Sequence, residues 1–128
     1  MIYIDSSVLL AHLLMEERRP PIAFWEQVSV SSRLLEYEVW NRIWARGLGQ
    51  SHRDEVRAIL RKVEMIELTR LSLRRALEPF PIGIRTLDAL HLATLDFIRG
   101  SGESVQLASF DNRLLAGARA LGIEVATL

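Results

Sequence analysis

Met1-Ile-Tyr-Ile-Asp-Ser-Ser7 is the stretch from which the fold of this chain is predicted. Residues 2–4 form a short β-branched and aromatic run without charge, which is typical of a strand buried on both faces of a parallel sheet. Asp5 follows at once, and the apolar segment 8–14 after it is long enough for a helix that one of the two serines would cap. Asp5 therefore lies at the carboxyl end of a first, central strand, where open α/β sheets bind their ligands, although helix capping alone also explains it.

Short apolar strands then alternate with helical stretches along the rest of the chain. We expect strands over residues 28–30, 65–68, 105–108 and 123–126, and helices over 22–27, 33–46, 52–63, 73–78, 86–99 and 111–121. Strands separated by helices predict βαβ units and a parallel sheet covered on both faces. The fold class is therefore α/β: a three-layer α/β/α sandwich around a central, mostly parallel five-stranded sheet, formed by residues 1–128 as a single domain.

Composition excludes several classes of protein. The chain has no net charge, so no global field attracts it to nucleic acid or to a membrane surface. It has no cysteine, which rules out disulfides and thiolate metal sites. We find no apolar run of about 18 residues and no signal-peptide pattern, so we expect a cytoplasmic protein without membrane association.

Three aspartates fall at comparable positions of the predicted fold. Asp5 follows the first strand, Asp111 lies three residues past the strand ending at Ala108, and Asp88 is in the first turn of the helix that begins at Thr86. Helix N-termini favour acids, which explains any one of them. The set is better explained if strands one and four flank the switch point of the sheet, because their carboxyl ends would then bring Asp5 and Asp111 together.

Glu38 is the fourth candidate acid. At about 100° per residue its side chain falls between Leu34 and Leu35, at the edge of the core-facing stripe of its helix. The alternative is an ordinary boundary glutamate that pairs with Arg42 one turn later.

A divalent cation would allow four carboxylates to converge. Two unit charges about 5 Å apart repel by roughly 3 kcal/mol at an effective dielectric constant of 20, and a cation removes that cost. Oxygen ligands suit Mg²⁺ or Mn²⁺. We expect His91, one turn beyond Asp88, to be a packed or hydrogen-bonding residue and not a ligand.

The acidic motifs resemble those of a known family. They are I-Y-I-D-S-S-V-L-L with Asp5, S-S-R-L-L-E-Y-E-V with Glu38, R-T-L-D-A-L-H-L-A-T with Asp88 and L-A-S-F-D-N-R-L with Asp111. Together they look like the motifs of PIN-domain ribonucleases, and most closely those of the VapC toxins of toxin–antitoxin pairs. Ser109 stands where that family often has threonine, and the turn over 99–104 lengthens the interval between the last two acids.

The resemblance implies a Mg²⁺-dependent endoribonuclease that acts as a toxin and hydrolyses RNA phosphodiesters with metal-activated water. Asp5, Glu38 and Asp88 would hold one Mg²⁺ (or Mn²⁺), and Asp111 would complete the site. The expected partners are the RNA substrate, a cognate antitoxin with a basic side chain directed at the acids, and a second copy in a homodimer. Three further residues would support the site: Ser6 and Ser109 by orienting water, and Arg85 by meeting a phosphate unless it simply faces solvent.

Other classes of protein fit less well. A phosphoacceptor receiver domain needs a lysine after strand five, and Lys62 cannot serve; a D-x-D phosphohydrolase needs an acid where Ser7 stands. A non-catalytic adaptor that binds RNA or protein stays open, with the carboxylates as helix caps. The tryptophans Trp25, Trp40 and Trp44 belong either to a partner surface or to core and dimer packing.

Overall fold

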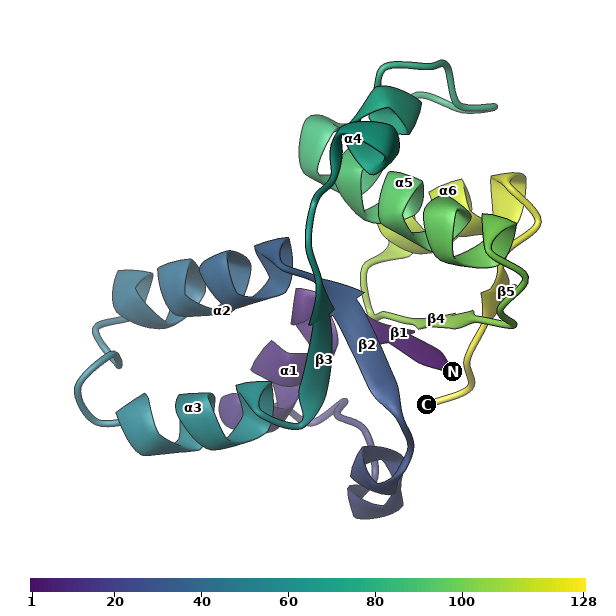
Figure 1. The fold of residues 1–128 in the computed structure, drawn as a ribbon. Coiled ribbons are helices and arrows are strands. Elements are labelled where there is room, and N and C mark those ends of the chain that lie inside the picture. The colour runs from purple at the N-terminus through teal and green to yellow at the C-terminus, as the bar shows by residue number, and fades with distance from the viewer.

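The computed structural model describes all residues 1–128 and contains a five-stranded sheet in which every neighbouring pair of strands is parallel. The strand order is β3-β2-β1-β4-β5, with β1 at the centre (Figure 1). The strands are β1 (Ile2–Ile4), β2 (Ser29–Ser32), β3 (Val63–Ile66), β4 (Gln106–Ala108) and β5 (Glu124–Val125). The predicted α/β fold with a central five-stranded sheet is confirmed.

Helices cover both faces of this sheet, as Figure 1 shows. They are α1 (Ser6–Leu13), the 3₁₀ helix η1 (Ile22–Glu26), α2 (Leu34–Ala45), α3 (Arg53–Leu60), α4 (Arg70–Ala76), α5 (Thr86–Gly100) and α6 (Asn112–Ala120). Helices α1, α2 and α3 share one core with the sheet, whereas α5 and α6 form the other core and α4 packs on α5. No helix combines the length and the apolar character needed to cross a membrane.

The central strand β1 contributes to both cores, as its composition predicts. Ile2 and Ile4 pack with α1, α2 and α3, and Tyr3 packs on the opposite face with α5 and α6. Successive side chains of a strand point to opposite faces, so an uncharged run is required when both faces are covered. All three side chains are buried.

The predicted positions of β2 and β3 are wrong by one or two residues at their starts. The helix expected to reach Val63 ends at Leu60, and Val63 begins β3, where it pairs with Ser29. Strand β2 starts one residue after the exposed Val28 and runs on through buried serines. Ser31 is accommodated there because its hydroxyl donates to the Ile4 carbonyl over 2.7 Å, which satisfies the polar group inside the sheet.

Helix starts also differ from the prediction. Asp5, and not a serine, caps α1, and Arg85 precedes α5 where Thr86 was expected to cap it. Helix α4 begins at Arg70, earlier than residue 73, because Thr69 and Ser72 form a capping box that fixes its first turn. Helix α2 ends as predicted at a glycine, since Gly47 adopts a φ of +70°.

The tryptophans are divided between core and surface. Trp40 packs against the core formed with α1 and α3, whereas Trp44 is 50% exposed and stacks on Trp40 with a centroid distance of 6.3 Å. Trp25 contacts Phe24 and His12 edge-on. Core packing is therefore confirmed for Trp40, whereas Trp44 lies at the surface and its packing in a dimer stays a prediction.

The strand order creates one switch point in the sheet. From β1 the chain moves outward to β2 and β3, and it then returns to β4 on the other side of β1 before reaching β5. The connections that leave β1 and β4 therefore turn to opposite faces, and a crevice opens between their carboxyl ends. Asp5 and Asp111 lie at these two ends, as the sequence predicts.

Candidate active site

A cavity of about 420 Å³ lies at the switch point and collects all four candidate acids. Asp5 comes from the end of β1, Glu38 from the middle of α2, Asp88 from the first turn of α5 and Asp111 from the cap of α6. The other residues lining it are Ser6, Ser7, Leu10, Asn41, Arg42 and Leu87. Four carboxylates that are up to 106 positions apart in the chain thus share one cavity.

Asp5 is held in place by hydroxyl groups. Its side chain is buried, and Oδ2 accepts hydrogen bonds from Ser7 Oγ at 2.6 Å and from Ser109 Oγ at 2.9 Å. The same oxygen accepts from the Ser7 backbone N–H at 3.4 Å, which caps α1, while Ser6 Oγ is 3.5 Å from Oδ1. Asp5 is therefore both the helix cap and a wall of the cavity.

The two serine hydroxyls also tie the loop after β1 to the loop after β4. Ser7 Oγ accepts from the Phe110 N–H and Ser109 Oγ accepts from the Asp111 N–H, each at 2.9 Å. Asp111 in turn caps α6, because its Oδ1 accepts from the backbone N–H groups of Arg113 and Leu114. Both loops at the switch point are thereby fixed by one hydrogen-bonded cluster.

Glu38 pairs with His91 and not with Arg42. Its Oε1 is 2.5 Å from Nε2 of His91, and no ion pair joins Glu38 to Arg42. His91 is buried, and its Nδ1 is 2.7 Å from Tyr3 Oη. Burial lowers the pKa of His91, but the hydrogen bond and the charge of Glu38, with the charges of Asp5 and Asp88, outweigh it and leave the pKa raised.

Asp88 shows that the carboxylates crowd one another. It is half-buried, and its side chain makes no hydrogen bond or ion pair within the chain. Burial raises the pKa of Asp88, and the negative charges of Asp111 and Asp5 raise it further. A cation placed among the acids would stabilise the charged form of Asp88.

The donor set fits a divalent cation. One potential ligand atom each from Asp5, Glu38 and His91 lies within 4.8 Å of the others, and oxygens of Asp88 and Asp111 line the same cavity. Carboxylate oxygens are the ligands that Mg²⁺ and Mn²⁺ prefer. Arg42 is the one cationic residue in the lining, so the chain itself does not balance four acids.

The supporting residues lie in different environments. Ser6 lines the cavity, Ser109 is buried beneath Asp5, and Arg85 is exposed before α5 and is not part of the lining. The sequence interpretation missed Ser7, Asn41 and Arg42. Asn41 and Arg42 follow Glu38 by three and four residues, and this helical spacing was the signal that could have revealed them.

Comparisons with known proteins agree with this geometry. The chain is 28% identical over 131 residues to ribonuclease VapC35 of Mycobacterium tuberculosis, which covers 98% of this chain and 95% of that protein. It is 28% identical over 134 residues to ribonuclease VapC47 of the same organism, covering 99% and 96% of the two chains.

Solved structures share the fold. A toxin–antitoxin complex from Klebsiella pneumoniae superposes with a TM-score of 0.67 at 18% identity, covering 99% of this chain and 97% of that one. PAE2754 from Pyrobaculum aerophilum gives 0.61 at 24% identity, covering 91% and 78%. The family model described as the PIN domain matches residues 2–120, nearly the whole length of the sequence. The chain therefore belongs to the PIN domain family.

Proposed function

We propose that this chain is a metal-dependent endoribonuclease that acts as the toxin of a toxin–antitoxin pair. The observation that carries the proposal is the single cavity in which Asp5, Glu38, Asp88 and Asp111 meet. Membership of the PIN domain family supports it, as do relatives named as VapC ribonucleases.

Asp5, Glu38 and Asp88 would hold a divalent cation, Mg²⁺ or Mn²⁺, with Asp111 completing the site. Such a cation, when bound, lowers the pKa of water and stabilises negative charge on a phosphodiester undergoing hydrolysis. The raised pKa of Asp88 supports this assignment, because burial and the negative charges of Asp111 and Asp5 outweigh the positive charges of His91 and Arg113.

The remaining residues of the site would position the acids and the substrate. Ser109 donates a hydrogen bond to Asp5 and accepts one from the Asp111 N–H, so we assign it to holding these two acids. Ser6 makes only a long contact with Asp5, which leaves its hydroxyl free to orient a water molecule. Arg42 in the lining and Arg85 at the start of α5 would bind RNA phosphates.

The partners follow from the same charges. A cavity with four acids and one arginine would accept a basic side chain, so a cognate antitoxin would inhibit by placing lysine or arginine there. We also propose a homodimer, supported by the resemblance to VapC toxins and by exposed apolar residues on α4 and the following loop, among them Leu73, Leu77 and Ile82. The site of action would be the cytoplasm, where the RNA is.

A non-catalytic adaptor is the rival proposal, in which the acids are only helix caps. Asp5 and Asp111 do cap α1 and α6. Glu38, however, lies in the middle of α2, and Asp88 accepts no backbone hydrogen bond at the start of α5. Two of the four acids thus have no capping role, which favours the nuclease.

Cleavage of RNA by purified protein tests the proposal. We expect Mg²⁺-dependent fragments from structured RNAs with the wild type, none after addition of EDTA, and none with Asp88→Asn. Asp96→Asn is the matched control, because Asp96 is an acid of the same helix that pairs with Arg75 and Arg99 outside the cavity. Equal cleavage by Asp88→Asn and the wild type would refute catalysis at this site.

A further inference from the structure

We infer that His91 is a positioning residue of this site: it fixes Oε1 of Glu38 through its own Nε2, which leaves Oε2 of Glu38 for the cation, and it is not itself a ligand. The inference rests on the proposed metal-dependent function. It assigns different roles to Glu38 and His91, which together with Asp5 have potential ligand atoms within 4.8 Å of one another.

Both ring nitrogens of His91 already have partners inside the protein. The ring is 1% exposed and lies between Glu38 Oε1, 2.5 Å from Nε2, and Tyr3 Oη, 2.7 Å from Nδ1. Tyr3 Oη in turn accepts from the Ser32 backbone N–H at 3.2 Å. A chain of hydrogen bonds therefore runs from β2 through β1 and α5 to Glu38 on α2.

A proton must lie between Nε2 and Glu38. Two bare acceptors repel one another at 2.5 Å, so the short contact requires a shared hydrogen. A neutral ring that accepts from Tyr3 at Nδ1 carries its own proton on Nε2, and a doubly protonated ring donates from both nitrogens. A ring that instead donates to Tyr3 from Nδ1 needs Glu38 to carry the shared proton, and its Nε2 lone pair then accepts that hydrogen bond. In none of these states does Nε2 have a free lone pair to offer a cation.

Glu38 needs such a partner because nothing else orders its side chain. It extends from the middle of α2 into the cavity, keeps 21% of its side-chain surface exposed and makes no other hydrogen bond or ion pair. A glutamate has three rotatable side-chain bonds, and fixing them before the cation arrives reduces the entropy lost on binding. Groups of this kind behind metal ligands commonly change metal affinity by about 10–100-fold.

A Mn²⁺ titration tests the positioning role of His91 without requiring catalysis. The electron paramagnetic resonance signal of free Mn²⁺ measures how much of the ion is bound. His91→Phe keeps a ring of similar size but has no donor, and we expect its Mn²⁺ affinity to fall about 10–100-fold. His91→Gln keeps an N–H near Nε2 and should stay within about threefold of the wild type. His52→Gln is the matched control, since His52 contacts Ser51 away from the cavity and the affinity should not change.

The wild-type protein supplies a second measurement that does not depend on variants folding. Electron spin echo spectra of the bound Mn²⁺ should show no coupling to a histidine nitrogen. Such a coupling would overturn the inference, as would equal Mn²⁺ affinities of folded His91→Phe and wild type or an equal loss with His91→Gln. Those outcomes would leave the proposed nuclease in place, whereas a wild type that binds no Mn²⁺ and cleaves no RNA would overturn both.

Discussion

The hydroxyl of Ser109 donates a hydrogen bond to Asp5 Oδ2 at 2.9 Å and joins two residues that are 104 positions apart in the chain. The same hydroxyl accepts the backbone N–H of Asp111. One small side chain thus sets the spacing between the acid that follows β1 and the acid that precedes α6.

We expect Ser109→Ala to lower the free energy of unfolding by about 1–3 kcal/mol, because a buried carboxylate loses a donor and a backbone N–H loses its acceptor. Urea denaturation measures the change. Ser109→Thr is the control that keeps the hydroxyl, and it should retain more stability than the alanine variant. A urea midpoint of Ser109→Ala equal to that of the wild type would contradict this account of the hydrogen-bonded loop cluster.

Asp88→Asn should melt higher than the wild type without metal, by roughly 1–4 °C. The pKa of Asp88 is raised in the folded state, so the unfolded chain loses this proton first as pH rises, and the wild type loses stability above the ordinary value of 3.8. Asparagine removes that loss. Calorimetry at neutral pH and at about pH 3 measures it, and the difference should vanish at the lower pH.

In excess Mg²⁺ the order should reverse, with the wild type melting at a higher temperature than Asp88→Asn. Binding at 100 times the dissociation constant stabilises a protein by about 2.7 kcal/mol, and only the wild type retains all four acids. A melting temperature of the wild type that ignores Mg²⁺ and Mn²⁺ would argue against a cation site in this cavity.

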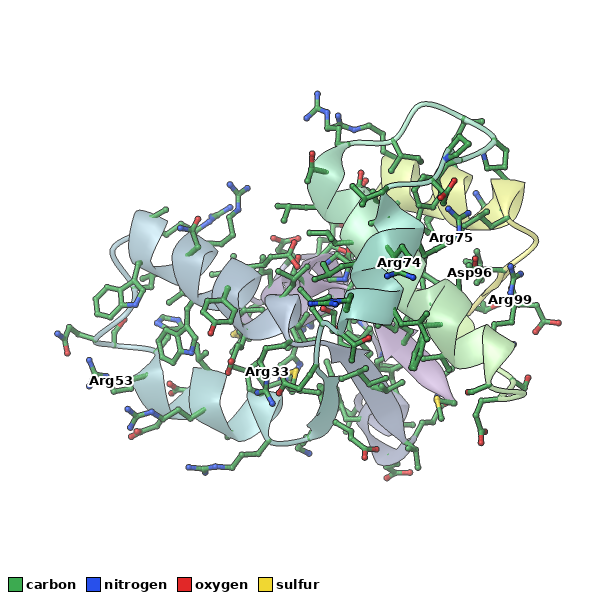
Figure 2. The ribbon with its side chains drawn as sticks, turned by 45° about the horizontal axis from the view of Figure 1, so that its top comes forward. Arg33, Arg53, Arg74, Arg75, Asp96 and Arg99 are labelled. Atoms are coloured by element: carbon green, nitrogen blue, oxygen red, sulfur yellow. The ribbon has the colours of Figure 1, made fainter.

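Asp96→Asn should destabilise the protein by about 1 kcal/mol and leave RNA cleavage unchanged. Asp96 on α5 accepts from Arg75 of α4 at 2.9 Å and from Arg99 at 2.7 Å, and Figure 2 labels the three residues where α4 packs on α5. Burial alone would raise the pKa of Asp96, but the two arginines outweigh it and hold the pKa below its usual value.

The pH dependence of that destabilisation has a definite sign. The contribution of Asp96 is present above the unfolded pKa and is lost as pH falls through the lower folded pKa. Urea midpoints of the wild type and of Asp96→Asn should therefore differ at neutral pH and converge in acid. Midpoints that diverge in acid would show that the pairs with Arg75 and Arg99 do not stabilise the folded state.

Arg42→Ala should weaken RNA binding and reduce the slope of log K against log salt by about 0.7, the value for one phosphate contact on a single strand. Arg42 lines the cavity and has no carboxylate partner, whereas Arg85 is exposed outside the lining. Fluorescence anisotropy in an Asp88→Asn background, where RNA stays intact, measures both arginines. A larger effect of Arg85→Ala would place the bound phosphate at the start of α5.

The fold was largely predictable because the local patterns agree with one another. Uncharged β1, the glycine after α2 and the alternation of strands with helices all favour the same parallel sheet. Val63 was misassigned because an apolar residue one turn after Ile59 suits a helix and a buried strand equally well. Only pairing with Ser29, a tertiary contact, decides between them.

The site was predictable for those of its residues that directly follow a strand or lie at the start of a helix. Asp5, Asp88 and Asp111 have such positions, and strand order then brings them into one cavity. The pairing of Glu38 with His91 joins residues 53 positions apart on α2 and α5, and no local spacing encodes it. Helical i,i+4 spacing favours Arg42 as the partner of Glu38, but Glu38 pairs with the buried imidazole of His91 instead.

The double use of Asp5 and Asp111 as helix caps has a practical consequence for anyone preparing an inert form of this protein. A substitution at either residue removes a helix cap together with a negative charge. Loss of RNA cleavage would then not distinguish a folded but inactive variant from a misfolded one. Asp88 carries no such structural duty. We therefore expect a substitution of Asp88 to abolish RNA cleavage while the fold is retained.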